Sequence, residues 1–496
     1  MTTKGFDNDK YLSLQSEKIK ERISEFGGKL YLEFGGKLFD DYHASRVLPG
    51  FQPDSKIRML TTMKDKVEVI IVINAVDIAK NKLRSDIGIT YDEDCFRLVD
   101  ILTQKGLYVG SVVISQFTAS NTAAVAFQKK LEKNGIKVYH HYTIEGYPYN
   151  VAHVVSEEGL GKNDYIETSR ELVVVTAPGP GSGKMATCLS QLYHEGKRGV
   201  KAGYAKYETF PVWNLPLNHP VNIAYEAATA DLNDVNMIDP WHLQAYNSSA
   251  VNYNRDIEVF PVLNSLFEKL LGQSPYKSPT DMGVNMAGFC ISDDEACCEA
   301  SRQEIIRRYY NALVAQRKGA DNANELEKIT IIMSKLGIKS TDRKVAVEAL
   351  HHSIKHSVPA AAMELNDGTI VYGKTSDLMG CASALLLNAL KVLAGIPDHV
   401  KLIAPNAIEP IQKLKTESLG DFTAQLHTDE VLIALSVSAA EHQLAEKALE
   451  QLPNLAGCQL HSTVISPHVD EKIFRKLGIQ ATSEPVYSVK RVYYNR

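Results

Sequence analysis

The stretch ELVVVTAPGPGSGKMATCLSQ, residues 171–191, decides the fold class of this chain. Its first part, 172–176, is a run of β-branched residues typical of a buried strand. Three glycines then form an elbow, and the residues from Met185 onward have the composition of a helix that Gly196 ends. Proteins use a strand, a glycine-rich loop and a helix in this order to hold a phosphate. The stretch therefore predicts an α/β fold around a loop of the phosphate-binding type.

Two residues depart from the usual phosphate-loop pattern G-x-x-x-x-G-K-[ST]. Pro178 occupies the first glycine position, and Met185 replaces the hydroxyl that would hold Mg²⁺. Proline lacks an N–H donor, and methionine does not coordinate a hard cation. A nucleotide with Mg²⁺ would then need Ser182, Thr187 or a distant carboxylate as the metal ligand. The predicted phosphate- or nucleotide-binding residues are Gly179, Gly181, Ser182, Gly183 and Lys184.

Two other interpretations of the same letters stay open. Gly181, Gly183 and Ala186 fit the G-x-G-x-x-A spacing of a dinucleotide-binding turn, with Glu208 as the acid for the ribose. That acid lies farther along than the usual ~20 residues, and the segment before it is poor in strand formers. The third interpretation is a tight turn without a ligand. By contrast, GTIVYGKT, residues 368–375, spells the full phosphate-loop pattern, but its strand-forming interior predicts a decoy.

The chain divides into three segments that differ in their pattern of strand and helix signals. Between about residues 66 and 195, β-branched runs alternate with amphipathic stretches, which indicates a parallel sheet with crossover helices. We predict an N-terminal α/β domain over 1–218, a mainly helical middle domain over 219–357 and a second α/β domain over 358–496. The boundaries are soft by several residues because no low-complexity linker separates the segments.

The C-terminal domain is predicted from a return of strand texture after Pro359. Asn-Asp-Gly at 366–368 is typical of a hairpin turn. Three further runs have the composition of strands, each followed by a helical stretch: HVKLIA (399–404), DEVLIALSVSA (429–439) and CQLHSTVI (458–465).

A dense group of polar residues lies in FGGKLFDDYHASRVLPGF, residues 34–51. Arginine, histidine and aspartate together can grip a phosphate or move a proton, so Asp41, His43 and Arg46 are our candidate catalytic residues. Lys37 is a candidate for lining the same pocket. The competing interpretation is a surface turn with salt bridges of little consequence.

Residues 204–257 combine Asn, Asp, His and Trp with prolines, a composition that often lines pockets. We single out Asn218, His219 and Asp231 as pocket candidates, with capping and turn chemistry as the competing explanation. No metal site is predicted. The seven cysteines are scattered, and the adjacent pair at 297–298 has no second pair to complete a zinc site.

The bulk composition excludes several classes of protein. The chain has 496 residues, of which 44% are hydrophobic and 23% are charged, values typical of globular domains. A net charge of -5 offers no broad basic field, so no nucleic-acid partner is expected. The N-terminus lacks the apolar core of a signal peptide, and no run approaches membrane-spanning length. We expect a cytoplasmic protein without a membrane partner, and homo-oligomerisation stays open.

Three segments together resemble a known bacterial family: FGGKLFDDYHASRVLPGF, TAPGPGSGKMATCLSQLYHEG and FPVWNLPLNHPVNIAYEAATADLNDVNMIDPWHL. The family is known as the domain of unknown function eighteen forty-six, and the chain is similar to it over nearly its whole length, including DGTIVYGKTSDLMGCASALLLNALK. The resemblance implies a multi-domain cytoplasmic protein with an N-terminal α/β part, a helical middle and a C-terminal α/β domain. It implies no particular reaction, so no catalytic residue is carried over.

These observations predict an enzyme that binds a phosphate or nucleotide and acts on a small phosphorylated molecule. An ATP-dependent phosphotransferase is one form of it, in which loop N–H groups hold the phosphates and Lys184 neutralises them. The first alternative is a non-enzymatic metabolite-binding or regulatory protein, which needs the same loop. The second is a nicotinamide-dependent oxidoreductase.

Overall fold

The chain forms two compact units. The computed structural model describes residues 4–84, 87–232 and 234–488. The larger unit consists of residues 4–226 and 234–300, and the smaller one of 301–488 with the short segment 227–232. The domain boundaries at 218 and 357 stay predictions from the sequence.

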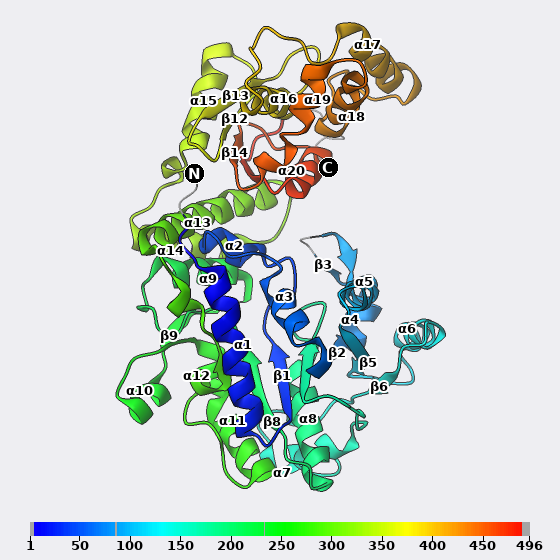
Figure 1. Cartoon of the computed structure of the whole chain (residues 1–496), viewed down its shortest axis with the longest axis vertical. Helices are drawn as coiled ribbons and strands as arrows, with labels where there is room; N and C mark the ends of the chain where they lie inside the picture. Colours follow the sequence, from blue (N-terminus) through cyan, green and yellow to red (C-terminus); the bar gives the residue numbers. More distant parts are fainter. Residues whose placement is uncertain (1–3, 85–86, 233, 489–496) are drawn as a thin grey trace. The chain divides into compact units, whose positions relative to one another are not determined.

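A parallel sheet of seven strands forms the framework of the larger unit (Figure 1), in the order β11-β8-β1-β7-β2-β5-β6. Every neighbouring pair in it is parallel, which confirms the predicted α/β class for this part of the chain. The strands are β1 (Leu30–Phe34), β2 (Val67–Asn74), β5 (Tyr108–Ser115), β6 (Val138–His140), β7 (Leu172–Thr176), β8 (Gly203–Tyr207) and β11 (Gly283–Val284).

Helices cover both faces of this sheet, which is why its central strands are continuous runs of buried β-branched residues. Helix α1 (Asn8–Glu25) runs along the front of the sheet in Figure 1, where the Tyr11 hydroxyl contacts the Tyr207 hydroxyl at 2.7 Å. Helices α8 (Lys184–Lys197) and α11 (Asn254–Leu271) pack on the opposite face around Tyr31. The sheet is therefore the middle layer of three.

The other elements of the larger unit are short or peripheral. Its helices include α2 (Tyr42–Val47), α3 (Ser55–Thr62), α4 (Ala75–Ala79), α5 (Tyr91–Gln104), α6 (Thr122–Lys133), α7 (Val151–Val154), α9 (Pro220–Ala228), α10 (Pro240–Tyr246) and α12 (Pro279–Met282). Two small antiparallel pairs are β3 (Leu83–Arg84) with β4 (Ile89–Thr90), and β9 (Asn236–Ile238) with β10 (Val251–Tyr253).

Strand β8 forms in a segment whose composition is poor in strand formers. The segment before Glu208 is β8, and it pairs in parallel with β1 over its whole length. Gly203 opens this strand because a Cβ there would lie 1.9 Å from Cγ of Phe26. The glycine that weakens the strand propensity thus makes room for an aromatic ring.

The smaller unit contains a mixed sheet in the order β13-β12-β14-β15, and this coarse α/β prediction is confirmed. Its strands are β12 (Ala360–Glu364), β13 (Ile370–Lys374), β14 (Gln459–Ser462) and β15 (Gln480–Ser483). Its helices are α14 (Ala323–Leu336), α15 (Lys344–His356), α16 (Cys381–Leu393), α17 (Pro405–Lys413), α18 (Thr428–Ala439), α19 (Gln443–Leu449) and α20 (His468–Lys476). Helix α13 (Asp294–Arg317) begins in the larger unit and continues into this one.

The predicted hairpin is present, whereas two of the three strand-like runs are not strands. β12 and β13 pair antiparallel around Gly368, which has a φ of 87°. The run 429–439 forms helix α18, because Glu430 accepts a hydrogen bond from the His427 N–H (2.7 Å) and the apolar residues repeat with helical spacing. The run 399–404 contains no strand, and 458–465 contains β14.

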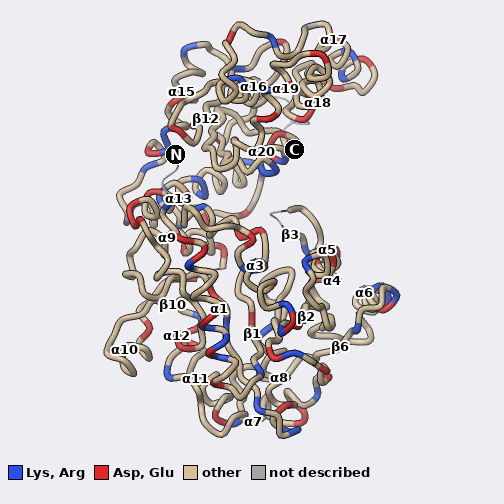
Figure 2. The backbone as a smooth tube through the Cα atoms, viewed as in Figure 1, with Lys and Arg blue, Asp and Glu red and all other residues tan. Residues whose placement is uncertain are grey.

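The literal phosphate-loop match at 368–375 is an extended strand, as expected for a decoy. A Cβ on Gly373 would lie 2.2 Å from the Leu385 backbone nitrogen. The glycine therefore permits close packing of β13 against α16. Among the described residues no helix is long and apolar enough to cross a membrane. Figure 2 shows basic and acidic residues interspersed along the chain.

Candidate functional site

The topological switch point of the parallel sheet lies between β1 and β7. The chain leaves β1 through α2 and α3 to reach β2 on one side, and it leaves β7 through α8 to reach β8 on the other side. The loops that follow these two neighbouring strands therefore diverge at the carboxyl edge. Open α/β sheets bind their ligands in the crevice at such a point. The glycine-rich loop after β7 occupies this position.

The loop after β7 is held by hydrogen bonds to its carbonyl groups. Ser115 Oγ donates to the Ser182 carbonyl at 2.6 Å, and Asn74 Nδ2 donates to the Gly181 carbonyl at 3.4 Å. In a trans peptide the next N–H points opposite to the carbonyl, so the N–H groups of Ser182 and Gly183 point away from these anchors. Helix α8 adds first-turn N–H groups that have no intrahelical acceptor. The loop and the first turn of α8 thus contain successive backbone N–H groups without a helical acceptor.

Two glycines of this loop are required by its geometry. Gly183 precedes α8 with a φ of 94°, a left-handed conformation that side chains rarely adopt. A Cβ on Gly179 would lie 2.2 Å from the Tyr91 hydroxyl oxygen, so this ring packs directly on the loop. Both residues therefore fix the loop shape.

Lys184 begins helix α8 and is partly buried. Burial lowers the pKa of this lysine, Glu33 on β1 partly opposes the fall, and Lys206 on β8 adds to it. Within the described part of the chain the Lys184 side chain makes no ion pair or hydrogen bond. An anion bound by the loop would restore the favourable electrostatics that burial removes.

A buried charge network, made of Lys206, Glu208, Asp256 and Tyr253, lies at the end of β8. Lys206 Nζ is 2.5 Å from Asp256 Oδ2 and 2.7 Å from Glu208 Oε1, and it donates to the Tyr253 hydroxyl. Burial alone would lower the pKa of Lys206, but Asp256 and Glu208 outweigh it and raise the pKa well above the ordinary value. Burial raises the pKa of Glu208, although Lys206 opposes this. Buried titratable groups of this kind concentrate at functional sites.

The predicted catalytic residues lie on helix α2 and at its N-cap, after β1. Asp41 caps α2 through the Ala44 N–H at 3.3 Å and pairs with Lys56 Nζ at 2.8 Å. Burial alone would raise the pKa of Asp41, but the charge and hydrogen bond of Lys56 outweigh it and lower the pKa. His43 packs edge-on against Phe210, at 5.1 Å between ring centroids. These residues follow β1 at the carboxyl edge of the sheet, and their catalytic role stays a prediction.

The other residues predicted for the site lie at separate positions in the larger and smaller units. Arg46 lies in the last turn of α2, and Lys37 is exposed in the loop after β1. Asn218 is exposed in the segment after β8. Asp231 is exposed in a 3₁₀ turn, Ala230–Leu232, that belongs to the smaller unit.

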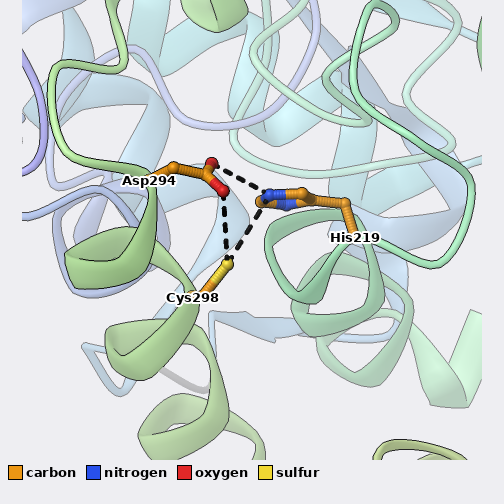
Figure 3. Close-up of side chains that lie close together, drawn as sticks. All are labelled: His219, Asp294 and Cys298. Carbon is orange, nitrogen blue, oxygen red and sulfur yellow. Dashed lines mark hydrogen bonds and ion pairs between the residues drawn. The ribbon is translucent and has the colours of Figure 1, made fainter.

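His219 lies in a cluster that the sequence did not suggest. Its side chain converges with those of Asp294 and Cys298, which are one turn apart on α13 (Figure 3). His219 Nε2 is 3.0 Å from Asp294 Oδ1 and 3.6 Å from Cys298 Sγ, and Cys298 Sγ is 3.9 Å from Asp294 Oδ2. The Val221 N–H donates to His219 Nδ1 at 3.3 Å.

The sequence suggests the hydroxyls of Ser182 and Thr187 as ligands for Mg²⁺, but both are buried in other contacts. Ser182 Oγ is buried and donates to the Gly179 carbonyl at 3.0 Å. Thr187 Oγ1 is buried beside His141 Nδ1 at 3.3 Å. Glu208, the candidate acid for a dinucleotide ribose, is engaged by Lys206 and Tyr253. The loop therefore offers backbone donors and a lysine, without a metal ligand of its own.

Sequence reasoning missed Glu33 and the network residues Lys206, Tyr253 and Asp256, and it named Glu208 only as the acid for a dinucleotide ribose. The sequence contains one signal that could have found them, a charged residue near the carboxyl end of a short strand. These residues are Glu33 in LYLEF (β1) and Lys206 in GYAKY (β8). Such a charge is costly unless it is paired, so it marks a site that the fold must satisfy locally. Asp256 had no comparable signal, because an acid in the first turn of a helix is ordinary.

Comparison with known proteins places the whole chain in one family. Residues 4–337 match the model described as "Domain of unknown function DUF1846, N-terminal", and residues 341–493 match its C-terminal counterpart. UPF0371 protein cu0538 of Corynebacterium urealyticum is 60% identical over 492 residues, 99% of each chain. UPF0371 protein DIP2346 of Corynebacterium diphtheriae is 58% identical over 100% of both chains, and a UPF0371 protein of Streptococcus pneumoniae (strain JJA) is 55% identical over 99% of this chain and 100% of that protein. The chain belongs to the DUF1846 family of UPF0371 proteins.

Proposed function

We propose that the chain is an enzyme that binds a small phosphorylated molecule or a nucleotide at the switch point between β1 and β7. The observation that carries the proposal is the coincidence of this switch point with a glycine-rich loop, a helix N-terminus and a partly buried lysine. Outward N–H groups and the positive end of α8 favour a phosphate there. Lys184 supplies the neutralising charge.

Acid–base chemistry at this edge of the sheet is assigned to Glu208. Glu208 is a carboxyl group at the end of β8 whose pKa burial raises, although Lys206 opposes this, and a carboxyl whose pKa is raised can serve as a proton-transfer group. Phosphoryl transfer itself asks mainly for positioning and charge neutralisation, which the loop and Lys184 provide. Because the loop hydroxyls are engaged, Mg²⁺ carried by a nucleotide would be held by the nucleotide and by carboxylates outside the loop.

Replacing Lys184 with alanine is expected to weaken the binding of ATP, GTP or inorganic phosphate by about 10- to 100-fold, the value of one charge-assisted contact. Isothermal titration calorimetry of the full chain measures this. Lys197→Ala is the matched control, since Lys197 lies in the last turn of the same helix and pairs with the exposed Glu157. Equal affinities of the wild-type chain and Lys184→Ala for all three probes would contradict the proposal.

Turnover separates an enzyme from a metabolite-binding protein. After long incubation with ATP and Mg²⁺, phosphorus NMR is expected to show conversion of the nucleotide or its transfer to an added acceptor. Binding with complete recovery of unchanged nucleotide would favour the regulatory alternative. A change in NADH or NADPH fluorescence on adding the chain would favour the nicotinamide-dependent alternative.

A further inference from the structure

We propose that His219, Asp294 and Cys298 form a binding site for a zinc-class divalent ion, with an open fourth position. The three donors are an imidazole nitrogen, a carboxylate oxygen and a sulfur, and they lie within 4.8 Å of one another. A thiolate excludes hard cations such as Mg²⁺ and Ca²⁺ and favours Zn²⁺ among abundant metals. Three protein ligands with a free position are the usual arrangement of catalytic zinc.

The observed spacing fits tetrahedral coordination. Zinc bonds of about 2.3 Å to sulfur and about 2.0 Å to nitrogen and oxygen, at tetrahedral angles, put the donor atoms about 3.3 to 3.6 Å apart. Here His219 Nε2 is 3.0 Å from Asp294 Oδ1 and 3.6 Å from Cys298 Sγ, and Cys298 Sγ is 3.9 Å from the other carboxylate oxygen, Asp294 Oδ2. With one ligand atom taken from each residue, the three atoms lie within 4.8 Å of one another. Small side-chain rotations therefore suffice to admit the ion, with no change in the backbone.

Two helices set these positions. Asp294 and Cys298 are four residues apart on α13 and so share one face of the helix. His219 immediately precedes α9 and reaches the same point from the other side (Figure 3). The His219 side chain is 9% exposed, whereas Asp294 is 63% exposed, which gives an ion a path from solvent and leaves the fourth position open. The negative charges of the Cys298 thiolate and the Asp294 carboxylate together neutralise the two positive charges of the ion.

Binding of the metal ion releases one proton from the site and moves a second proton from one imidazole nitrogen to the other. The zinc–sulfur bond forms as the Cys298 thiol releases its proton to water, and no electron is transferred. The Val221 N–H bond holds the lone pair of the free imidazole on Nδ1 and its proton on Nε2, facing Asp294. Metal binding at Nε2 moves this proton to Nδ1 and opens the long Val221 contact. Because that contact is 3.3 Å, it is a weak competitor.

Co²⁺ is the probe for the test, because a cobalt–thiolate bond gives a charge-transfer band in the near ultraviolet. The full chain is expected to show this band with one equivalent of Co²⁺ and to lose it when Zn²⁺ is added. Cys298→Ser should abolish the band and weaken Zn²⁺ binding by at least about 100-fold, since outer-shell partners alone are worth about 10- to 100-fold.

The neighbouring residues supply matched controls. Cys297 donates to the Gly5 carbonyl at 3.2 Å, and Asp293 caps the helix through the Ala296 N–H at 3.0 Å. Cys297→Ser and Asp293→Ala should therefore keep the cobalt band, whereas Asp294→Ala should weaken it. Lys184→Ala should leave the cobalt band unchanged, so the metal-site proposal and the phosphate-site proposal are tested independently. The absence of a band in the folded wild-type chain, or a band that survives in Cys298→Ser, would overturn the proposal.

Discussion

Replacing Lys206 with methionine is expected to lower the free energy of unfolding of the larger unit by about 3–5 kcal/mol. Lys206 is 6% exposed and is the cation that neutralises Asp256 and Glu208. Its removal leaves two buried carboxylates without their partner, which costs far more than an ion pair contributes at the surface. Trp213 and Trp241 are the two tryptophans of the chain and both lie in the larger unit. Denaturant unfolding followed by tryptophan fluorescence therefore reports on this unit.

The matched control is Lys66→Met. Lys66 pairs with Glu171 at 2.8 Å, a distance similar to that of the buried pair, but both side chains are at least half exposed. We expect a loss below about 1 kcal/mol for this variant. Equal effects of Lys66→Met and Lys206→Met would contradict the role given to the buried charge network.

The loss in Lys206→Met should depend on pH. A carboxyl whose folded pKa is raised stabilises the fold below its unfolded pKa and loses that contribution as the pH rises through the folded pKa. Burial already raises the pKa of Glu208, and removal of the opposing Lys206 charge raises it further. The destabilisation is therefore expected to be smallest in acid, where Glu208 is protonated, and to grow toward neutral pH.

Replacing Arg343 with methionine is expected to destabilise the smaller unit by about 3–5 kcal/mol, because several hydrogen bonds from a buried charged donor are lost together. Arg343 is 1% exposed and ties the start of α15 to two strands of the mixed sheet. Its guanidinium donates to Thr482 Oγ1 at 2.9 Å, Gln459 Oε1 at 2.8 Å, and the carbonyls of Leu460 and Gln480 at 3.2 and 2.7 Å. Methionine fills part of the volume but removes the donor of all four hydrogen bonds.

Circular dichroism measures this second effect. The transition of the smaller unit should move to lower denaturant concentration while the tryptophan transition stays in place. Lys344→Met is the control, because Lys344 is the next residue and pairs with Glu364 at 3.2 Å with its own side chain 56% exposed. An Arg343→Met variant as stable as this control would show that the four hydrogen bonds contribute little.

The sequence predicts the framework of the larger unit well because its signals are local. The short run 172–176 is buried along its whole length and rich in β-branched residues, which is typical of a strand covered by helices on both faces of a sheet. Glycines with a required conformation, such as Gly183, mark the elbow unambiguously. The run 429–439 misled because exposed positions of the helix, such as Ile433 and Val437, are also apolar, so its composition matches that of a buried strand, and its cap at Glu430 was the better signal.

The composition of the candidate sites depends on long-range contacts and was less predictable. Lys206 and Asp256 are 50 residues apart, and His219 and Cys298 are 79 apart. Their meeting depends on the position of β8 beside β1 and on the start of α13, which no local pattern encodes. The adjacent cysteines at 297–298 have no second pair in the sequence, and of the two groups that approach Cys298 one, Asp294, lies on the same helix, whereas His219 comes from a distant part of the chain.

Amide hydrogen exchange at residues 179–186 tests the central claim most directly. The account predicts that saturating ATP or inorganic phosphate slows exchange of the loop and first-turn N–H groups from Gly181 to Ala186, because these groups become donors to the phosphate. The hairpin turn at 366–368 serves as the internal control and should be unaffected. Unchanged exchange at 181–186 while ligand is bound, or protection confined to 368–375, would contradict the account.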